Sequence, residues 1–522
     1  MCEMIRFKIA NLATSGLLWL VASFFTPLAV SGQEFIPLRG ERPPIDLDAL
    51  SDDVWEPGRL RIRFSEDFAP ANAPPGIAFR INQKGELVSG MPSLDSLNRA
   101  NGVYLARPTF ESRAFSGEFR ERHRKWGFHL WYDIYFDDNI NIRQLLDSYV
   151  RIEGISFAEP HYRKVLIGNP EPLDVSCRDV LAMPEQSPGD TLSGKESEPW
   201  FPNDPLFSSQ WHYHNTGQAN GTPGADISLP QAWSVSRGSD EVIVAVIDGG
   251  IRWDHAALSA SMWENIGYNF FLDTTLVLGT HHGTHVGGTV GATTNNATGV
   301  SGIAGGSGDQ PGVRLMSLQV FLDMGGAGFE LAPVFAADNG AAISQNSWGY
   351  GAPNVYEQAV LDAIDYFNTH GGGALLRGGI TFNSAGNSNS NAPFYPGVYS
   401  GCFAVAATNN KDQKAYYSNF GNYVDISAPG GEMSPQNAGA VYSTSITLSG
   451  YAFAEGTSMA CPHVSGVAAL WWEATRAGAL PANAGTVSMR LLSSATVAGI
   501  APGVQVADRG QGLAQAPLSP IG

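Results

Sequence analysis

The chain has 522 residues, of which 43% are hydrophobic and 15% are charged. This balance excludes a largely disordered protein, and the length leaves room for more than one domain. With 49 acidic and 31 basic side chains, the formal net charge is −18. We therefore expect no nucleic-acid partner, because phosphate binding needs a basic surface.

The first residues predict an export signal. Arg6 and Lys8 precede the apolar run Leu17–Phe25, and Ala29-Val30-Ser31 places small residues where a signal peptidase cuts. A membrane anchor is the alternative, but the run is shorter than the roughly 20 residues that span a bilayer. We therefore expect a cleaved signal peptide at residues 1–31, a secreted protein (extracellular or periplasmic) and no stable membrane span.

A small α+β domain is predicted at residues 55–167. The segment Arg59–Phe64 alternates between polar and apolar residues, as a half-buried strand does. Two strand-helix-strand passages follow one another in this region, which is typical of a ferredoxin-like unit. The remaining elements expected here are a helix at 94–99, a strand at 103–106, a β-rich run at 128–136, a helix at 142–149 and a strand at 155–160.

Residues 168–199 are rich in Pro, Ser, Gly, Asp and Glu, which is the composition of a linker. Strands and helices alternate in the next segment, residues 200–516. The segment Glu241–Ile247 is almost entirely apolar, as in a parallel strand that is covered on both faces. Similar runs lie at 315–321 and 403–407, and helical patterns lie at 355–367 and 464–472. This alternation predicts an α/β domain with a doubly wound, mostly parallel sheet, whose sites collect at the carboxyl ends of the strands.

Four residues supply the parts that acyl transfer to a serine needs: a nucleophile, a base, a group that orients the base and an oxyanion donor. Asp248 ends the apolar strand, where a lone aspartate is otherwise a turn or cap residue. His282 opens a helix of small residues. Together with His285, three residues later, it could also be a metal ligand, but the motif contains no nearby carboxylate to complete such a site. Ser458 precedes a long apolar helix, either as an N-cap or as a nucleophile whose own N–H helps to hold an oxyanion. Asn387 ends a strand, either as a turn residue or as an amide donor.

Together and in this order, these segments resemble the subtilisin family of serine peptidases. The order Asp, His, Ser along the chain is also the order of that family. The resemblance implies a serine endopeptidase, with the catalytic residues at the centres of the motifs. The matching stretches are AVIDGGI around Asp248, HGTHVGGT from His282, NSWG from Asn346, NSAGN ending at Asn387 and GTSMACPHVSG around Ser458.

The resemblance also implies that polypeptide substrates bind as an extended strand between two backbone edges. Ser347-Trp348-Gly349 would form one edge and the glycine-rich loop around Gly326 the other. Residues 55–167 resemble the propeptides of the family, which assist folding and block the cleft, so that cleavage is expected between Lys164 and Trp200. A permanently attached N-terminal domain is the alternative. The expected enzyme is a monomer whose partners are polypeptide substrates and its own propeptide.

Two departures from the family pattern affect specificity and metal binding. Phe394 stands where the floor of the primary specificity pocket often carries glycine, and no fixed charge is evident there, so we expect a neutral residue before the cleaved bond. Residues 293–300 resemble a calcium loop with Asn296 as its side-chain ligand, yet Ala257 stands where a ligating aspartate is often found. No cofactor is required for the chemistry, and structural calcium stays open.

The competing interpretation is a catalytically inert protein of subtilisin fold that binds peptides, although every catalytic residue is present. An esterase of the α/β-hydrolase type is disfavoured because the Gly-x-Ser-x-Gly motif is absent around Ser458. The 4 cysteines are too few for a disulfide scaffold. Once Cys2 leaves with the signal segment, at most one bridge is expected among Cys177, Cys402 and Cys461.

Overall fold

The computed structural model describes residues 40–68, 79–167, 198–322, 325–375 and 378–476, with side chains as far as Trp471. All of these residues belong to one compact unit of the chain. The predicted signal peptide, most of the predicted linker and the end of the predicted peptidase domain lie outside the described residues. Within them, no helix combines the length and the apolarity that crossing a bilayer takes.

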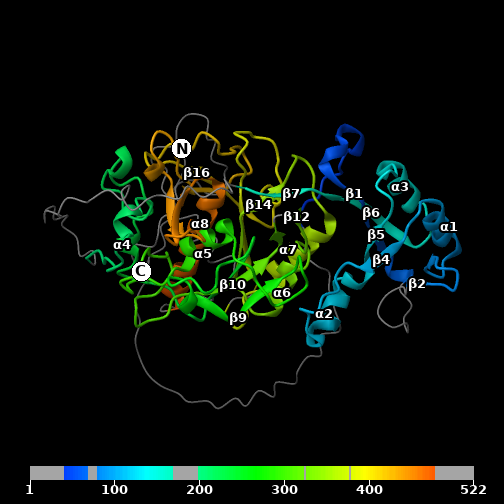
Figure 1. Ribbon diagram of the computed structural model, residues 1–522, viewed down its shortest axis with the longest axis horizontal. Helices are drawn as coiled ribbons and strands as arrows, with labels where there is room; N and C mark the ends of the chain where they lie inside the picture. Colours follow the sequence, from blue (N-terminus) through cyan, green and yellow to red (C-terminus); the bar gives the residue numbers. More distant parts are fainter. Residues whose placement is uncertain (1–39, 69–78, 168–197, 323–324, 376–377, 477–522) are drawn as a thin grey trace, which may run out of the picture. The chain divides into compact units, whose positions relative to one another are not determined.

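A parallel sheet of seven strands, in the order β17-β16-β15-β13-β8-β10-β9, organises the second half of the described chain (Figure 1). Each neighbouring pair in it is parallel. The predicted α/β class with a parallel sheet is confirmed. The strands are β8 (Ile243–Asp248), β9 (Met262–Asn269), β10 (Arg314–Gln319), β13 (Ile343–Asn346), β15 (Ile380–Ser384), β16 (Phe403–Thr408) and β17 (Ile426–Pro429).

Helices cover both faces of this sheet, and its interior strand β8 is accordingly apolar on both sides. Val244 and Val246 of β8 belong to the core that contains α5 and α8. Ala245 and Ile247 belong to the core that contains α6 and α7. Successive side chains of a strand point to opposite faces, so one apolar run supports two cores. The helices are α4 (Leu229–Ala232), α5 (His281–Gly291), α6 (Ala332–Asp338), α7 (Gln358–His370) and α8 (Thr457–Arg476).

Residues 40–167 contain a second, antiparallel sheet of four strands in the order β4-β5-β1-β6. Along the chain, strand, helix, strand, strand, helix and strand follow one another: β1 (Trp55–Phe64), α1 (Pro92–Ala100), β4 (Leu105–Pro108), β5 (Trp131–Tyr135), α3 (Ile142–Tyr149) and β6 (Ile155–Tyr162). Smaller elements here are β2 (Arg80–Ile81), β3 (Leu87–Val88) and α2 (Arg120–Lys125).

The β-rich run at 128–136 is only partly a strand. Phe128–Leu130 forms a 3-10 turn, and β5 begins at Trp131. Gly127 before it has φ +74°, a left-handed conformation that favours glycine. The Leu130 N–H donates to the Gly127 carbonyl at 3.0 Å, so this local bond takes the place of a sheet partner.

Strand β7 (Lys164–Leu166) connects the two halves of the described chain. It pairs in antiparallel fashion with β14 (Trp348–Tyr350), as Figure 1 shows. It also contacts β12 (Gly325–Gly326). Apolar residues of the four-stranded sheet share a core with α6 and α7. The remaining strands are β11 (Phe321–Leu322), β18 (Val441–Thr444) and β19 (Tyr451–Ala454).

Candidate active site

The residues predicted to be catalytic lie at the carboxyl edge of the parallel sheet. Asp248 is the last residue of β8, and Asn387 follows the end of β15 by three residues. His282 and Ser458 are each the second residue of a helix, α5 and α8. In open parallel sheets the loops at this edge form the ligand site, and the fold therefore brings these distant segments together.

Asp248 and His282 are in direct contact. His282 Nδ1 lies 2.9 and 3.0 Å from the two carboxylate oxygens of Asp248. His282 is 2% exposed and Asp248 is 0% exposed. Burial lowers the pKa of His282, but the Asp248 charge, its hydrogen bond and the Ile167 backbone outweigh burial and raise that pKa above its ordinary value. A carboxylate at Nδ1 favours the tautomer whose Nε2 carries a lone pair, which is the form that acts as a base.

The start of α5 is shaped so that His282 can approach β8. The Thr280 hydroxyl caps the helix by accepting the Gly283 N–H at 3.2 Å. A β-carbon on Gly283 would lie only 2.5 Å from the Gly250 carbonyl oxygen, just beyond Asp248. Only glycine permits this close approach, which explains the residue that follows His282 in the motif.

The two other histidines of this helix have partners away from Asp248. His281 Nδ1 lies 2.8 Å from the Ser445 hydroxyl, and His285 Nε2 lies 3.1 Å from the Val441 carbonyl oxygen. Burial lowers the pKa of both histidines, which keeps them neutral. Both therefore have the environment of structural residues.

Ser458 is fully buried at the start of α8. Its Oγ donates to the Ser347 carbonyl at 3.1 Å, and its own carbonyl accepts the Ser347 hydroxyl at 2.9 Å. Pro462 lies four residues further along α8 and has no N–H, so the Ser458 carbonyl lacks its usual helical donor and accepts the Ser347 hydroxyl instead. In this rotamer the serine hydroxyl points to the neighbouring strand edge and not to His282 Nε2.

Asn387 is anchored by its side-chain oxygen. Oδ1 accepts the Thr457 N–H at 3.0 Å and the Thr457 hydroxyl at 2.8 Å. This arrangement leaves Nδ2 as the donor end of the amide, beside the first turn of the helix that carries Ser458. An amide donor and a helix N-terminus are the groups that stabilise an oxyanion.

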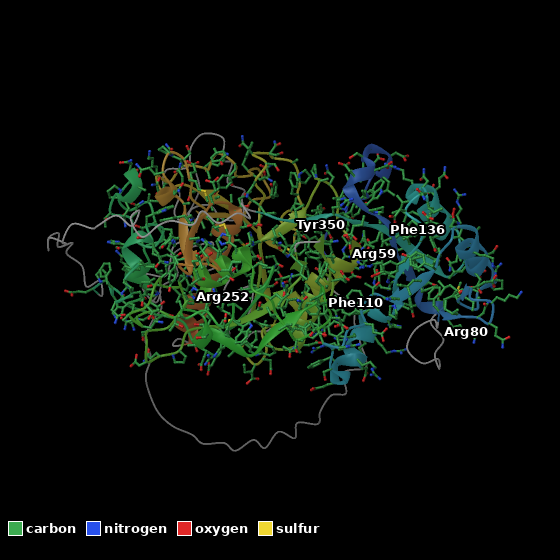
Figure 2. The ribbon with its side chains drawn as sticks, viewed as in Figure 1. Arg59, Arg80, Phe110, Phe136, Arg252 and Tyr350 are labelled. Carbon is green, nitrogen blue, oxygen red and sulfur yellow. The ribbon has the colours of Figure 1, made fainter. Side chains whose placement is uncertain are left out.

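The predicted edges of the substrate channel enclose an extended segment of the chain itself, residues 164–167. The Ile167 N–H donates to the Ser347 carbonyl at 3.1 Å, and Trp348 and Gly349 pair with the two preceding residues. A β-carbon on Gly349 would lie 2.8 Å from Ile167 Cδ1, so glycine makes room for that side chain. Tyr350, labelled in Figure 2, ends this edge strand, and the Gly326 strand contacts the same segment.

The loop at residues 293–300 does not offer the ligands that calcium requires. Asn296 Oδ1 accepts the Thr298 N–H at 2.9 Å. The nearby Asp204 carboxylate is already engaged by donors, namely the N–H groups of Asn295 and Asn296 and the hydroxyl of Ser301. Calcium needs several converging oxygens, including carboxylates, and Ala257 supplies none. The residues present therefore do not fit this ion.

The two cysteines within the described residues are buried and free. Cys461 Sγ lies 3.6 Å from the Asn346 carbonyl oxygen. Burial raises the pKa of both Cys402 and Cys461, which disfavours the reactive thiolate. Cys177 lies outside the described residues.

Sequence reasoning missed a group of buried charges beside the channel. Glu357, just before α7, forms ion pairs with Lys164 and with Arg61, the latter at 3.0 Å. Glu330 lies 3.2 Å from Arg61, which is fully buried. The alternation of polar and apolar residues in β1 was the one sequence signal that bears on Arg61. It assigned Arg61 to the polar face of the strand, which a half-buried strand exposes to solvent. The second half of the chain covers that face.

A buried Asp–His pair, a serine at a helix start and an anchored amide are the parts that a serine-dependent acyl-transfer enzyme needs. The sequence model of the subtilase family matches residues 239–513. Thermitase from Thermoactinomyces vulgaris is 36% identical over 278 residues, which cover 52% of this chain and 85% of thermitase. An extracellular protease from Xanthomonas campestris pv. campestris is 32% identical over 344 residues, which cover 59% of this chain and 56% of that protein.

A solved structure adds a likeness of fold. Fervidolysin from Fervidobacterium pennivorans matches with a TM-score of 0.55 and 22% identity, over 93% of this chain and 63% of that one. The chain belongs to the subtilase family. It is a subtilisin-like serine endopeptidase.

Proposed function

We propose that this subtilase is a secreted precursor that activates itself and then hydrolyses extended polypeptide as a monomer, with Asp248, His282 and Ser458 as its triad. The observation that carries the proposal is the position of residues 164–167. Residues 164–166 pair with the β14 edge in extended conformation, and the Ile167 N–H donates to the Ser347 carbonyl next to the candidate triad. Main-chain pairing of this kind binds polypeptide by its backbone.

In the proposed mechanism, Ser458 Oγ attacks the scissile carbonyl carbon while His282 Nε2 takes its proton. Asp248 keeps the imidazole in the required tautomer and stabilises the imidazolium. The oxyanion is held by Asn387 Nδ2 and the Ser458 N–H. His282 then gives its proton to the leaving amine, which leaves an acyl-enzyme. Water, with His282 again as the base, releases the acid and restores the serine.

We place the first cleavage at the bond between Ile167 and Gly168. The Ile167 N–H reaches the Ser347 carbonyl, which itself accepts the Ser458 hydroxyl at 3.1 Å. The Ile167 backbone also acts on the His282 ring. We therefore take the carbonyl of Ile167 as the scissile carbonyl. Its side chain is neutral, as expected for the residue before the bond.

We assign residues 55–167 as a ferredoxin-like propeptide domain that assists folding and blocks the channel. Its strand and helix order and its antiparallel sheet support this assignment. Ion pairs link it to the peptidase part, including those of Arg61 with Glu330 and Glu357. Export is supported by the signal pattern at residues 1–31 and by the extracellular protease among the relatives.

The test is expression of the full chain beside a Ser458→Ala variant, with exposed Ser449→Ala as the matched control. We expect the wild type and the control to shorten to a chain that begins at Gly168 and to digest casein. The Ser458→Ala chain stays full length and inactive. N-terminal sequencing of the product reports the cleaved bond directly.

Other outcomes separate the alternatives. A folded wild type that never shortens and never digests casein would support the inert peptide-binding protein. A Ser458→Ala chain that is as active as the wild type would remove this serine as the nucleophile. An active wild type that keeps its N-terminal domain covalently attached would support a permanent domain.

A further inference from the structure

The side chain of Lys164 is held in a pocket beside the substrate channel. Counting back from the proposed scissile bond after Ile167, Lys164 is the fourth residue. Its ammonium forms an ion pair with the Glu357 carboxylate, and the two side chains are only 5% and 1% exposed. A lysine covered to this degree needs a partner, because a buried unpaired charge is costly.

Two aromatic rings complete the walls of this pocket. Lys164 Nζ lies 5.1 Å from the ring centroid of Phe329 and 5.2 Å from that of Tyr350. A cation within about 6 Å of an aromatic ring is attracted by the ring face. The pocket therefore combines a carboxylate with two rings, which is the chemistry that recognises a cationic side chain.

The carboxylate of Glu357 is otherwise engaged by the N-terminal part of the chain. Its Oε1 accepts the Tyr162 N–H at 2.9 Å, and its Oε2 accepts Arg61 Nη1 at 3.0 Å. His161 Nδ1 lies 3.8 Å away. These partners, like Lys164, all belong to the segment that the proposed cleavage releases. After release, Glu357 faces the channel without them, while the β14 edge that binds the substrate backbone stays.

We propose that the mature enzyme prefers substrates with a basic side chain at the fourth residue before the cleaved bond, and that Glu357 determines this preference. The inference rests on the proposed function, because it takes residues 164–167 as a substrate-like segment. A lysine or arginine there restores the ion pair and the ring contacts seen with Lys164. A neutral side chain leaves the carboxylate covered and unpaired, and an acidic one adds repulsion.

The experiment uses the processed wild-type enzyme and internally quenched peptides that copy residues 163–172. The peptides carry lysine, norleucine or glutamate at the position of Lys164, and mass spectrometry confirms the cleaved bond. We expect kcat/KM to be higher for the lysine peptide than for the norleucine peptide by about tenfold, which corresponds to about 1.4 kcal/mol. The glutamate peptide is expected to be the poorest of the three.

The same ratio is then measured in two variants that each remove one negative charge. Glu357→Gln is expected to bring the lysine-to-norleucine ratio close to one. Glu264→Gln, on an exposed position of β9, is the matched control and keeps the wild-type ratio. Because each ratio is taken within one variant, a general loss of activity in Glu357→Gln does not affect the comparison.

Several results would overturn the inference. The first is equal kcat/KM values for the lysine and norleucine peptides in the wild type. The second is a lysine-to-norleucine ratio that is unchanged in Glu357→Gln. The third is a ratio that falls equally in Glu357→Gln and in Glu264→Gln. Cleavage at another bond would remove Lys164 from the fourth position. If the wild type cleaves neither casein nor any of the peptides, the proposed function fails as well. Cleavage without discrimination leaves that function standing.

Discussion

The pH dependence with which the proposed propeptide dissociates tests how Glu159 affects the contact between the two parts of the chain. Glu159 in β6 is 4% exposed, and its carboxylate accepts the N–H groups of Gln358 at 2.6 Å and Ala359 at 3.4 Å, in the first turn of α7. Burial raises the pKa of Glu159, and the negative charge of Glu357 raises it further. The positive charge of Arg61 lowers it, and the net result is a pKa of about 8.

The sign of the effect follows from linkage. In the released domain, we expect the Glu159 carboxyl to return to its ordinary pKa of 4.5. The bound form therefore holds the proton more tightly, and this contribution to binding is fully present below pH 4.5 and is lost as the pH rises through about 8. Between pH 6.5 and 7.5 the wild-type complex should weaken by up to about tenfold through this group.

Two neighbouring groups also contribute to the pH dependence of binding. The pKa of Glu357 is lowered to about 2, because nearby cations outweigh burial, so its contribution changes only below its ordinary 4.5. Burial lowers the pKa of His161 to about 3 in the complex, so a released His161 with its ordinary pKa of 6.5 takes up a proton around that pH; His161 is present in both proteins that are compared, so this effect cancels. His282 is common to both chains that are compared, so its titration cancels.

The assay compares the wild type with Glu159→Gln, whose side chain does not titrate. Processed complexes are diluted at pH 6.5 and at pH 7.5, and aliquots are assayed for peptidase activity at one common pH. We expect release of the wild-type domain to accelerate more between the two pH values than release of the variant domain, by up to about tenfold. Equal acceleration in the two proteins would refute the role given to Glu159.

Three further substitutions test the site. Asp248→Asn should lower kcat by about 10⁴-fold and move the acid limb of kcat/KM to lower pH, because Asp248 raises the pKa of His282; an unmoved limb would contradict this coupling. Asn387→Ala should lower kcat by about 100- to 1,000-fold with a smaller change in KM, since the amide acts mainly on the oxyanion; a loss confined to KM would assign it to substrate binding instead. Gly349→Val should raise KM and slow processing, because its β-carbon would lie 2.8 Å from Ile167 Cδ1; steady-state kinetics and gel analysis report both, and unchanged values would show that the segment does not follow this path.

Helix boundaries show where local patterns stop being sufficient. The apolar spacing predicted a helix from residue 355, but α7 begins at Gln358. Glu159 of the other sheet accepts the first N–H groups of that helix, so a distant residue defines its start. Similarly, α8 begins at Thr457, well before the predicted 464, and it continues past Pro462. Pro462 has no N–H to donate to the Ser458 carbonyl, and this carbonyl accepts the Ser347 hydroxyl instead.

The amino-acid pattern was sufficient to predict the α/β class, the sheet strands near residues 241–247, 315–321 and 403–407, and the segments that carry Asp248, His282 and Ser458, whereas β9, β13 and β17 were not predicted. These features depend on short-range properties, namely apolar periodicity and motif chemistry, which neighbouring residues express together. The pairing of Lys164 with Glu357, the burial of Arg61 and the anchoring of Asn387 by Thr457 were decided only by the tertiary structure. Each of them joins residues far apart in the chain. Whether such charges and amides are exposed or paired depends on which surfaces pack together, and no local pattern encodes that.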